Sequence, residues 1–348
     1  MHAAIEQAIL PLLERRDVPE SACRTAVAAI MDGECDEISI AAFLTALRVK
    51  GESVDEIVGA ARAMSERAER VPTQRCGLLD TCGTGGDELR TLNISTATAI
   101  VAAACGIPVA KHGNRSVSSS SGSADVLEAL DVNTQLTPAQ VGRCIDELGI
   151  GFCFAPMFHG AMRHAVPVRK ALRFRTLFNL LGPLTNPAQA EFQLLGASRI
   201  ATAEKLANAS AKLGRSRVLV VCGNDQLDEV SLWGETAVFE VVGESVTHRI
   251  WTAATFGLPE CDVAQLRVES SAESAARLQE VFAGAPGPAR DIIVANTAAA
   301  LIATSAAIEP RAAAERAAKA IADGKAAELL TKFAEFTHNV AKAQSRSD

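Results

Sequence analysis

The sequence predicts an α/β fold, with a small helical N-terminal domain followed by a larger domain whose mostly parallel sheet is flanked by helices. Residues 1–70 show only the apolar spacing of helices, whereas short apolar runs alternate with helical runs from Cys76 onward. The chain has 348 residues, enough for two domains or one large one. Its apolar fraction of 48% is ample for a core.

The N-terminal stretch contains three apolar stripes in which residues three, four or seven apart fall on one helical face. Gly51-Glu52-Ser53 separates the second stripe from the third, because glycine ends a helix and serine caps the next one. We expect short helices whose charged residues form a solvated face. The stripes consist of Ile5, Ile9, Leu12 and Leu13, then Ile38, Ile40, Phe43, Leu44 and Leu47, then Val54, Ile57, Val58, Ala61 and Met64.

The rest of the chain alternates strand and helix signals, which is typical of a parallel sheet with helices on both faces. Two runs split by Gly243-Glu244, at 237–242 and 246–250, predict a hairpin, and residues 311–340 read as helical. The other strand candidates are Leu78-Leu79, Ile107–Ala110, Gly151–Ala155, Gln193–Gly196, Val218–Cys222 and Ile292–Ala295.

The stretch from His159 to Ala188 interrupts this alternation and predicts two helices that pack on the N-terminal helices. The helical domain is then discontinuous: we expect residues 1–70 to be joined by about 160–188. Residues 71–159 and 189–348 form the α/β domain in this prediction.

Three polar loops lie within the stretch from Asp80 to Asp131, joined by apolar segments. The first loop, Gly83-Thr84-Gly85-Gly86-Asp87, has three glycines in four residues, so backbone N–H groups can approach an anion closely. The second is Asn93-Ile94-Ser95-Thr96. The third runs from Lys111 through Arg115 and four serines to Asp125. The order of strand, loop, helix, strand and loop predicts a βαβ unit with all three loops at one edge.

The second and third loops add positive potential. Ser95 and Thr96 precede the apolar run Ala97–Cys105, where hydroxyls can cap a helix whose N-terminus attracts phosphate. Lys111 and Arg115 contribute full charges. Each motif alone is more often a tight turn, an ordinary cap or a solvated turn. All three together, within about fifty residues, favour a phosphate-binding site.

Asp228-Glu229 is the best candidate for a magnesium site, because Mg²⁺ prefers hard oxygen ligands. Neighbouring carboxylates diverge on a helix or a strand and can share a metal only from a turn. Residues 222–227 are such a turn after a predicted strand. The alternative is an acidic, exposed loop tip without a ligand.

The chain resembles the anthranilate phosphoribosyltransferase family. The motifs are GTGGD, NIST, KHGNRSVSS, GSADVLEAL, FAP at 154–156, Val168-Arg169, RTLFNLLGPLTNP at 175–187 and LDEVSL at 227–232. The likeness extends from residue 42 to the C-terminal helices. It implies a nucleoside phosphorylase/phosphoribosyltransferase-like fold with the active site between the domains. It also implies transfer of the phosphoribosyl group of phosphoribosyl pyrophosphate (PRPP) to the amine of anthranilate, in tryptophan biosynthesis.

The resemblance also implies site residues. Anthranilate is expected at Gly83, Asn114 and Arg169, and Mg²⁺ at Ser95, Asp228 and Glu229. An arginine fork suits the carboxylate of anthranilate, although Arg163, Arg173 and Arg175 are nearby alternatives, and the sequence leaves open whether His112, His159 or His164 takes part. PRPP is expected at Gly83, Gly86, Asp87, Thr91, Asn93, Ile94, Ser95, Thr96, Lys111, His112, Gly113, Asn114, Arg115, Ser116, Val117, Ser118, Ser119 and Ser123.

Four positions depart from the family pattern: Phe158 replaces a common His or Tyr, Gly160 a common Pro, Arg173 a common Gly, and Cys222 a frequent His. The first two lie near the expected acceptor site, so the anthranilate contacts are less secure than those of the pyrophosphate. No residue is assigned as a general base, because an aryl amine is already neutral at pH 7.

Composition and charge narrow the possible functions and the cellular compartment of the protein. A net charge of −7 disfavours a nucleic-acid-binding relative of the fold, which needs a basic groove. A pyrimidine nucleoside phosphorylase shares the architecture, but Asp228-Glu229 and the 111–115 loop argue against it. Nine cysteines without C-x-x-C spacing predict reduced thiols, and no apolar run or leader is evident, so we expect a cytoplasmic protein without membrane contact. The apolar helical domain and the resemblance imply a homodimer.

Overall fold

The computed structural model describes residues 1–115 and 121–344. Four of the expected PRPP contacts, Ser116, Val117, Ser118 and Ser119, lie outside the described residues. Within those residues, no helix combines the length and apolarity needed to cross a membrane.

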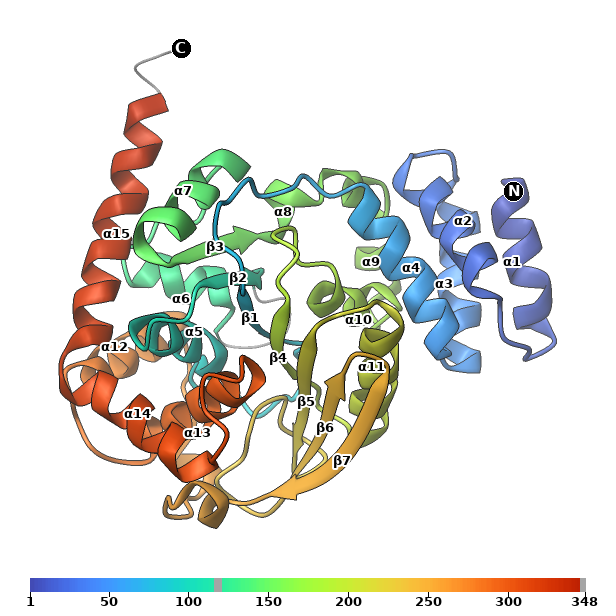
Figure 1. Cartoon of the computed structure of the whole chain (residues 1–348). Helices are drawn as coiled ribbons and strands as arrows, with labels where there is room; N and C mark the ends of the chain where they lie inside the picture. The colour runs from blue at the N-terminus through green and yellow to red at the C-terminus, as the bar shows by residue number, and fades with distance from the viewer. Residues whose placement is uncertain (116–120, 345–348) are drawn as a thin grey trace.

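Four helices form the N-terminal unit at one end of the molecule (Figure 1). Asp36 and Ser53 cap α3 and α4 with their side chains, and Ser53 shares a capping box with Glu56. Glu56 is fully buried and also accepts a hydrogen bond from the backbone N–H of Val18 at 2.8 Å, so its carboxylate joins α4 to the start of α2. The helices are α1 (Ala3–Leu13), α2 (Glu20–Met31), α3 (Glu37–Lys50) and α4 (Val54–Glu66).

A seven-stranded sheet occupies the centre of the larger unit, in the order β3-β2-β1-β4-β5-β6-β7. The first five strands in this order are parallel, and β6 and β7 pair antiparallel, so the predicted hairpin and mostly parallel sheet are confirmed. The strands are β1 (Leu79–Gly83), β2 (Val109–Gly113), β3 (Ile150–Phe154), β4 (Phe192–Gly196), β5 (Arg217–Gly223), β6 (Thr236–Val242) and β7 (Ser245–Trp251).

Helices cover both faces of the sheet. On one face α5 and α13 contact the strands, with α14 and α15 packed behind them, and on the other α11 contacts β5 and β6 and joins the sheet to α4. Side chains alternate accordingly: Leu194 belongs to the core beneath α5 and α13, whereas Leu195 belongs to the core shared with the N-terminal helices. These helices are α5 (Ile94–Ala104), α6 (Ser123–Ala129), α7 (Pro138–Leu148), α11 (Ile200–Lys212), α12 (Ser271–Phe282), α13 (Pro288–Ala303), α14 (Pro310–Ala322) and α15 (Lys325–Gln344).

The segment after β3 runs across to the N-terminal helices. Its short helix η1 contacts α2, α9 contacts α3, and α10 contacts α4. Val168 and Leu181 are buried in the same core as α1–α4. The segment contains α8 (Ala155–Phe158), η1 (Gly160–His164), α9 (Val166–Leu172), α10 (Phe178–Leu181) and η2 (Gly182–Leu184).

One strand prediction is wrong. Ile292–Ala295 lies inside α13, a sixteen-residue helix in which thirteen residues are buried. A helix that is apolar all round shows the same short run of branched residues as a buried strand, and a window of four residues cannot separate the two. The helical neighbours 296–303 extend the element far beyond the length of a typical strand.

Candidate active site

A pocket of about 330 Å³ opens at the carboxyl ends of the parallel strands. β1 lies between β2 and β4, so the strand order reverses at β1. Open α/β sheets bind ligands at such a reversal, beyond the carboxyl ends of the strands. Four of the five parallel strands end in glycine, namely Gly83, Gly113, Gly196 and Gly223. Without Cβ atoms at these ends, the loops after the strands can converge around the pocket.

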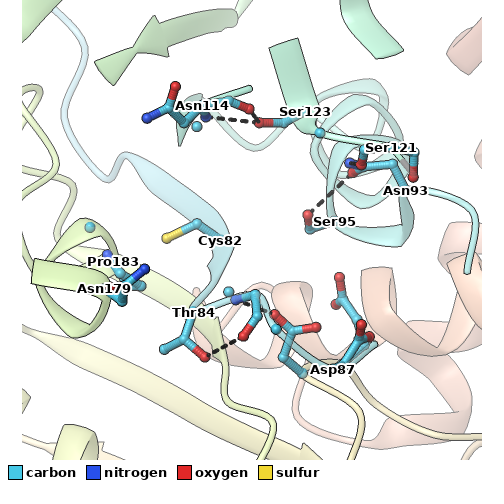
Figure 2. A pocket seen from close by; sticks show the side chains of 18 of the residues that line it. Cys82, Thr84, Asp87, Asn93, Ser95, Asn114, Ser121, Ser123, Asn179 and Pro183 are labelled. Atoms are coloured by element: carbon cyan, nitrogen blue, oxygen red, sulfur yellow. Dashed lines mark hydrogen bonds between the residues drawn. The ribbon is translucent and has the colours of Figure 1, made fainter. Parts of the chain in front are cut away.

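Most of the predicted residues line this pocket. In the view of Figure 2, Asn93, Ser95 and Ser121 lie on one side and Asn179 and Pro183 on the other. The predicted residues that line it are Gly83, Gly86, Asp87, Thr91, Asn93, Ile94, Ser95, Lys111, His112, Gly113, Asn114, Arg115, Ser123, Arg169, Asp228 and Glu229.

The glycine loop is packed closely against the side chains of Asp228 and Arg175. A Cβ on Gly83 would stand 2.2 Å from Oδ2 of Asp228, and one on Gly86 would stand 2.0 Å from a guanidinium nitrogen of Arg175. Gly86 also has φ of 81°, in the left-handed region. The backbone N–H of Gly85 donates to Oδ2 of Asp228 at 2.8 Å, so the loop is joined directly to the acidic pair.

The N-terminus of α5 faces the pocket, but its cap differs from the prediction. Asn93, not Ser95 or Thr96, is the N-cap, and its Oδ1 accepts from the backbone N–H of Thr96 at 3.0 Å. Thr96 is buried, does not line the pocket and donates its N–H to this cap, so its predicted contact with PRPP is not supported. Ser95 sits in the first turn and lines the pocket, as Figure 2 shows.

Lys111 lines the pocket with a buried side chain. Its Nζ donates to the carbonyl of Thr81 and, at 3.2 Å, to Oγ of Ser95. Burial lowers the pKa of its ammonium, while nearby carboxylates, Asp80 first and then Glu229 and Asp228, act in the opposite direction. The lysine is therefore placed to balance negative charge in the site.

Arg115 is already engaged by acidic side chains of α6. Its guanidinium donates to Oδ1 of Asp125 at 2.9 Å and to both oxygens of Glu128 at 2.8 and 2.6 Å, and it lies over the ring of Phe154. Arg115 lines the pocket, but its guanidinium is paired with these carboxylates, so its contact with a phosphate stays a prediction. An acidic partner thirteen residues away becomes a neighbour only once the loop and α6 fold together.

Three carboxylates gather at the other end of the pocket. Burial and the neighbouring Asp228 raise the pKa of Asp87 to about 7, and burial raises the pKa values of Asp228 and Glu229 as well. The alternative of an exposed acidic loop tip does not fit, because both Asp228 and Glu229 are half-buried. Carboxylates held this close repel one another, and a bound cation relieves that cost.

The carboxylates and Ser95 fit a magnesium ion. Among residues 1–115 and 121–344, no group of three or more His, Cys, Asp or Glu side chains is arranged to hold a metal ion by itself. Mg²⁺ rarely needs such a group, because it keeps several waters and takes oxygens from substrate phosphates together with one or two carboxylates. The donor set of hydroxyl and carboxylate oxygens therefore suits Mg²⁺ bound together with a pyrophosphate.

Two arginines of the crossing segment project into the pocket. Arg169 is half-buried over the ring of Phe178, and within the described part of the chain it has no ion pair. Burial, and then the nearby charge of Arg175, lower its pKa. Arg175 instead donates to the carbonyl of Thr84 at 2.7 Å. A desolvated guanidinium without a carboxylate partner, as at Arg169, is a site for an anionic ligand.

His112 lies at the base of the pocket and is neutral at physiological pH. Burial lowers its pKa to about 4, and its Nδ1 lies 2.9 Å from the carbonyl of Gly182, so Nδ1 carries the proton. Its ring centroid is 5.1 Å from that of His159, whose pKa burial lowers to about 3. His159 does not line the pocket.

Several lining residues were given no role from the sequence, although most of them lie within the three loops or the 175–187 motif. Arg90 reaches the pocket from a left-handed backbone position with φ of 57°. Arg175 was considered only as an alternative partner for a carboxylate, and nothing in its local sequence indicates that it covers the glycine loop. The other such residues are Cys82, Thr84, Gly85, Leu92, Ser121, Gly122, Phe178, Asn179, Gly182 and Pro183.

Comparison with known proteins gives one consistent family. Residues 75–327 match the model of the glycosyl transferase family a/b domain, and residues 6–68 match its helical bundle domain. The anthranilate phosphoribosyltransferase of Thioalkalivibrio sulfidiphilus is 48% identical over 333 residues, covering 96% of this chain and 98% of the relative.

Solved structures agree. The crystal structure of anthranilate phosphoribosyltransferase from Thermus thermophilus superposes with a TM-score of 0.90 at 40% identity, covering 97% of this chain and 100% of that one. The Saccharomyces cerevisiae enzyme, in complex with PRPP and Mg, gives 0.90 at 28% identity, covering 97% and 99%.

Proposed function

The chain belongs to the anthranilate phosphoribosyltransferase family, and we propose that the pocket at the carboxyl ends of β1, β2 and β5 is where it performs that reaction. The enzyme transfers the 5-phosphoribosyl group of PRPP to the amine of anthranilate, giving N-(5-phosphoribosyl)anthranilate and pyrophosphate in tryptophan biosynthesis. One observation supports this assignment most. The same pocket holds a glycine loop bonded to Asp228 and, in Arg169, a guanidinium that forms no ion pair within the described residues.

We assign PRPP to the half of the pocket built by the glycine loop and the start of α5. Backbone N–H groups of residues 83–87 and the positive end of α5 attract the diphosphate. Asn93 and Ser95 face the same space (Figure 2). Because Arg115 is bound to Asp125 and Glu128, PRPP must either displace those partners or bind without that guanidinium.

Magnesium is the metal of this reaction, and we assign it to Asp228, Glu229 and Ser95, with Asp87 beside them. When bound, it neutralises the charge that develops on the leaving pyrophosphate, an effect worth several kcal/mol. The protein's own contribution is to hold these oxygens at one end of the pocket. Lys111 balances their charge.

Anthranilate is assigned to the side lined by Arg169, Asn114 and Gly83. The guanidinium of Arg169 can form two parallel hydrogen bonds with a carboxylate, and it is available because it forms no ion pair within residues 1–115 and 121–344. An aryl amine is a nucleophile without deprotonation, so no general base is required. Holding it in line with the ribose can supply at most about 7–11 kcal/mol.

The function is tested by following anthranilate fluorescence in the presence of PRPP and Mg²⁺. We expect consumption that needs both additions, with release of pyrophosphate. Consumption of pyrimidine nucleosides with inorganic phosphate, and none of anthranilate, would instead identify a nucleoside phosphorylase.

Replacing Arg169 by alanine should raise the KM for anthranilate about tenfold or more and leave the KM for PRPP nearly unchanged. The reason is the loss of a charge-assisted hydrogen bond, worth roughly 1.5–3 kcal/mol. Steady-state kinetics with each substrate varied in turn provide the measurement. Arg163→Ala is the matched control, because Arg163 is exposed and does not line the pocket. An equal rise in both KM values would mean that Arg169 supports the pocket as a whole.

We also propose that the enzyme is a homodimer joined through the helical domain. An apolar groove of about 660 Å³ lies between α1 and α3, where Leu13 is 69% exposed and Ile38 81% exposed. Such a patch on a small domain is typical of a protein interface. The nine unpaired cysteines, five of them buried, suit a reducing compartment, and we place the protein in the cytoplasm.

Light scattering tests the dimer. We expect the wild type to be dimeric at micromolar concentration and the Leu13→Lys/Ile38→Lys variant to be monomeric, because two buried charges would oppose association. Ile308→Lys is the control, since Ile308 is 82% exposed and lies outside the groove. A wild type that is monomeric at this concentration contradicts the proposal.

A further inference from the structure

The pocket wall formed by Gly182 and Pro183 is held by side chains of β2 and β4, in addition to the longer bonds, of 3.4 Å, from Thr185 to the carbonyl of Gly182. Both residues belong to η2 and line the pocket. The carbonyl of Gly182 accepts from Nδ1 of His112 at 2.9 Å, and the carbonyl of Pro183 accepts from Nε2 of Gln193 at 2.6 Å. Further along the segment, Asn186 donates to the carbonyl of Ala110 at 2.7 Å.

Gln193 connects this wall to the central strands. It lies on β4 directly opposite Asp80 of β1, and its Nε2 also donates to Oδ2 of Asp80 at 3.2 Å. The other oxygen, Oδ1 of Asp80, accepts from the backbone N–H of His112 at 2.9 Å. Asp80 therefore accepts hydrogen bonds from Gln193, which holds Pro183, and from His112, which holds Gly182.

The network is costly to the fold. Asp80 is fully buried, and Oε1 of Gln193 is buried without a hydrogen-bond partner within the described residues. A buried polar atom left unpaired is unfavourable, and an apolar side chain of similar size can replace such a pair with little or no loss of stability. A glutamine and an aspartate at these two positions are therefore better explained by what they hold in place.

We propose that Gln193 and Asp80 are positioning residues for the acceptor side of the pocket. They hold Gly182 and Pro183 against His112, and so set the width of the space in which anthranilate lies beside Arg169. The inference rests on the proposed function. Neither residue touches the diphosphate half of the pocket, because Gln193 does not line the pocket and Asp80 is enclosed between β1, β2 and β4.

The test replaces Gln193 by methionine, which keeps the length of the side chain and removes the amide. We expect the KM for anthranilate to rise about tenfold, the size expected for losing one strong hydrogen bond to the wall. The KM for PRPP should stay within about twofold. Gln193→Asn, which keeps an amide but shortens its reach, should show the same split with a smaller rise, and it decides the question if the methionine variant does not fold.

Gln140→Met is the matched control. Gln140 also makes two hydrogen bonds, to the N–H of Thr137 at 2.8 Å and the carbonyl of Val340 at 3.0 Å, but it caps α7 away from the pocket. We expect this variant to lower the Tm and leave both KM values unchanged. The proposal is overturned if the Gln193 variants behave like the control, or if they raise both KM values equally. A wild type that does not consume anthranilate would instead refute the proposed function.

Discussion

The Asp228→Asn/Glu229→Gln double variant is expected to lose at least about a thousandfold in kcat/KM. A metal contribution of several kcal/mol corresponds to several decades of rate at 1.36 kcal/mol per decade. Asparagine keeps an oxygen for the N–H of Gly85, which donates to Asp228 at 2.8 Å, so the glycine loop should stay in place. Alanine is the poorer choice, because it would leave that N–H unpaired.

The same variant should be more stable than the wild type in the absence of metal. The pKa of the Asp87 carboxyl is raised from 3.8 to about 7 by folding. Between about pH 4 and pH 7 the folded state therefore binds a proton that the unfolded state has lost. The contribution of Asp87 to stability is fully present below about pH 4 and is lost as the pH rises toward 7. Removing the charge of Asp228, one of the two main causes of the raised pKa, should make the fall in Tm between pH 4 and 7 shallower.

The control is Glu235→Gln, an exposed carboxylate at the other end of the same loop. It should leave kcat/KM and the pH profile of the Tm unchanged. The readout that does not depend on turnover is the rise in Tm on adding Mg²⁺ with PRPP, which should shrink in the double variant and persist in the control. Near-normal turnover and an undiminished Tm shift would show that the metal enters on PRPP alone.

The features that could be predicted from the sequence are local ones. The glycine loop, the helix that follows it and the acidic turn are each defined by neighbouring residues, and each lines the pocket. The hairpin was predicted for the same reason, since Gly243-Glu244 sits between two alternating runs.

The sequence does not show contacts between distant segments. Arg115 looks like a free cation until α6 brings Glu128 to it, and the turn at Asp228 looks exposed until Gly85, 143 residues earlier, packs on it. The preference for Arg169 over Arg175 rested on the family resemblance, because their different partners arise only in the folded pocket. Periodicity within a segment carries no information of this kind.

Gly196→Ala is expected to damage both stability and turnover. A Cβ at this position would stand 1.6 Å from the carbonyl oxygen of Asp228 and 2.5 Å from its carbonyl carbon. Both are backbone atoms, so the clash cannot be relieved by a change of rotamer, and either β4 or the acidic turn must move. Overpacking of this kind typically costs about 1–3 kcal/mol, occasionally more. A displacement of about 1 Å at the carboxylates can cost roughly a hundredfold in turnover.

Gly160→Ala is the matched control for this effect. A Cβ at Gly160 would meet nothing within 4 Å, and its φ is outside the left-handed region, so the change in unfolding free energy should stay within about 0.5 kcal/mol. Chemical denaturation and steady-state kinetics on both variants, with Mg²⁺ titrated, separate the two consequences. If Gly196→Ala unfolds more easily yet keeps wild-type kcat and Mg²⁺ dependence, the strand end supports the fold alone. In that case Asp228 and Glu229 would tolerate displacement without loss of activity. This outcome would contradict their assignment as ligands of Mg²⁺, because a metal ligand must be held in position.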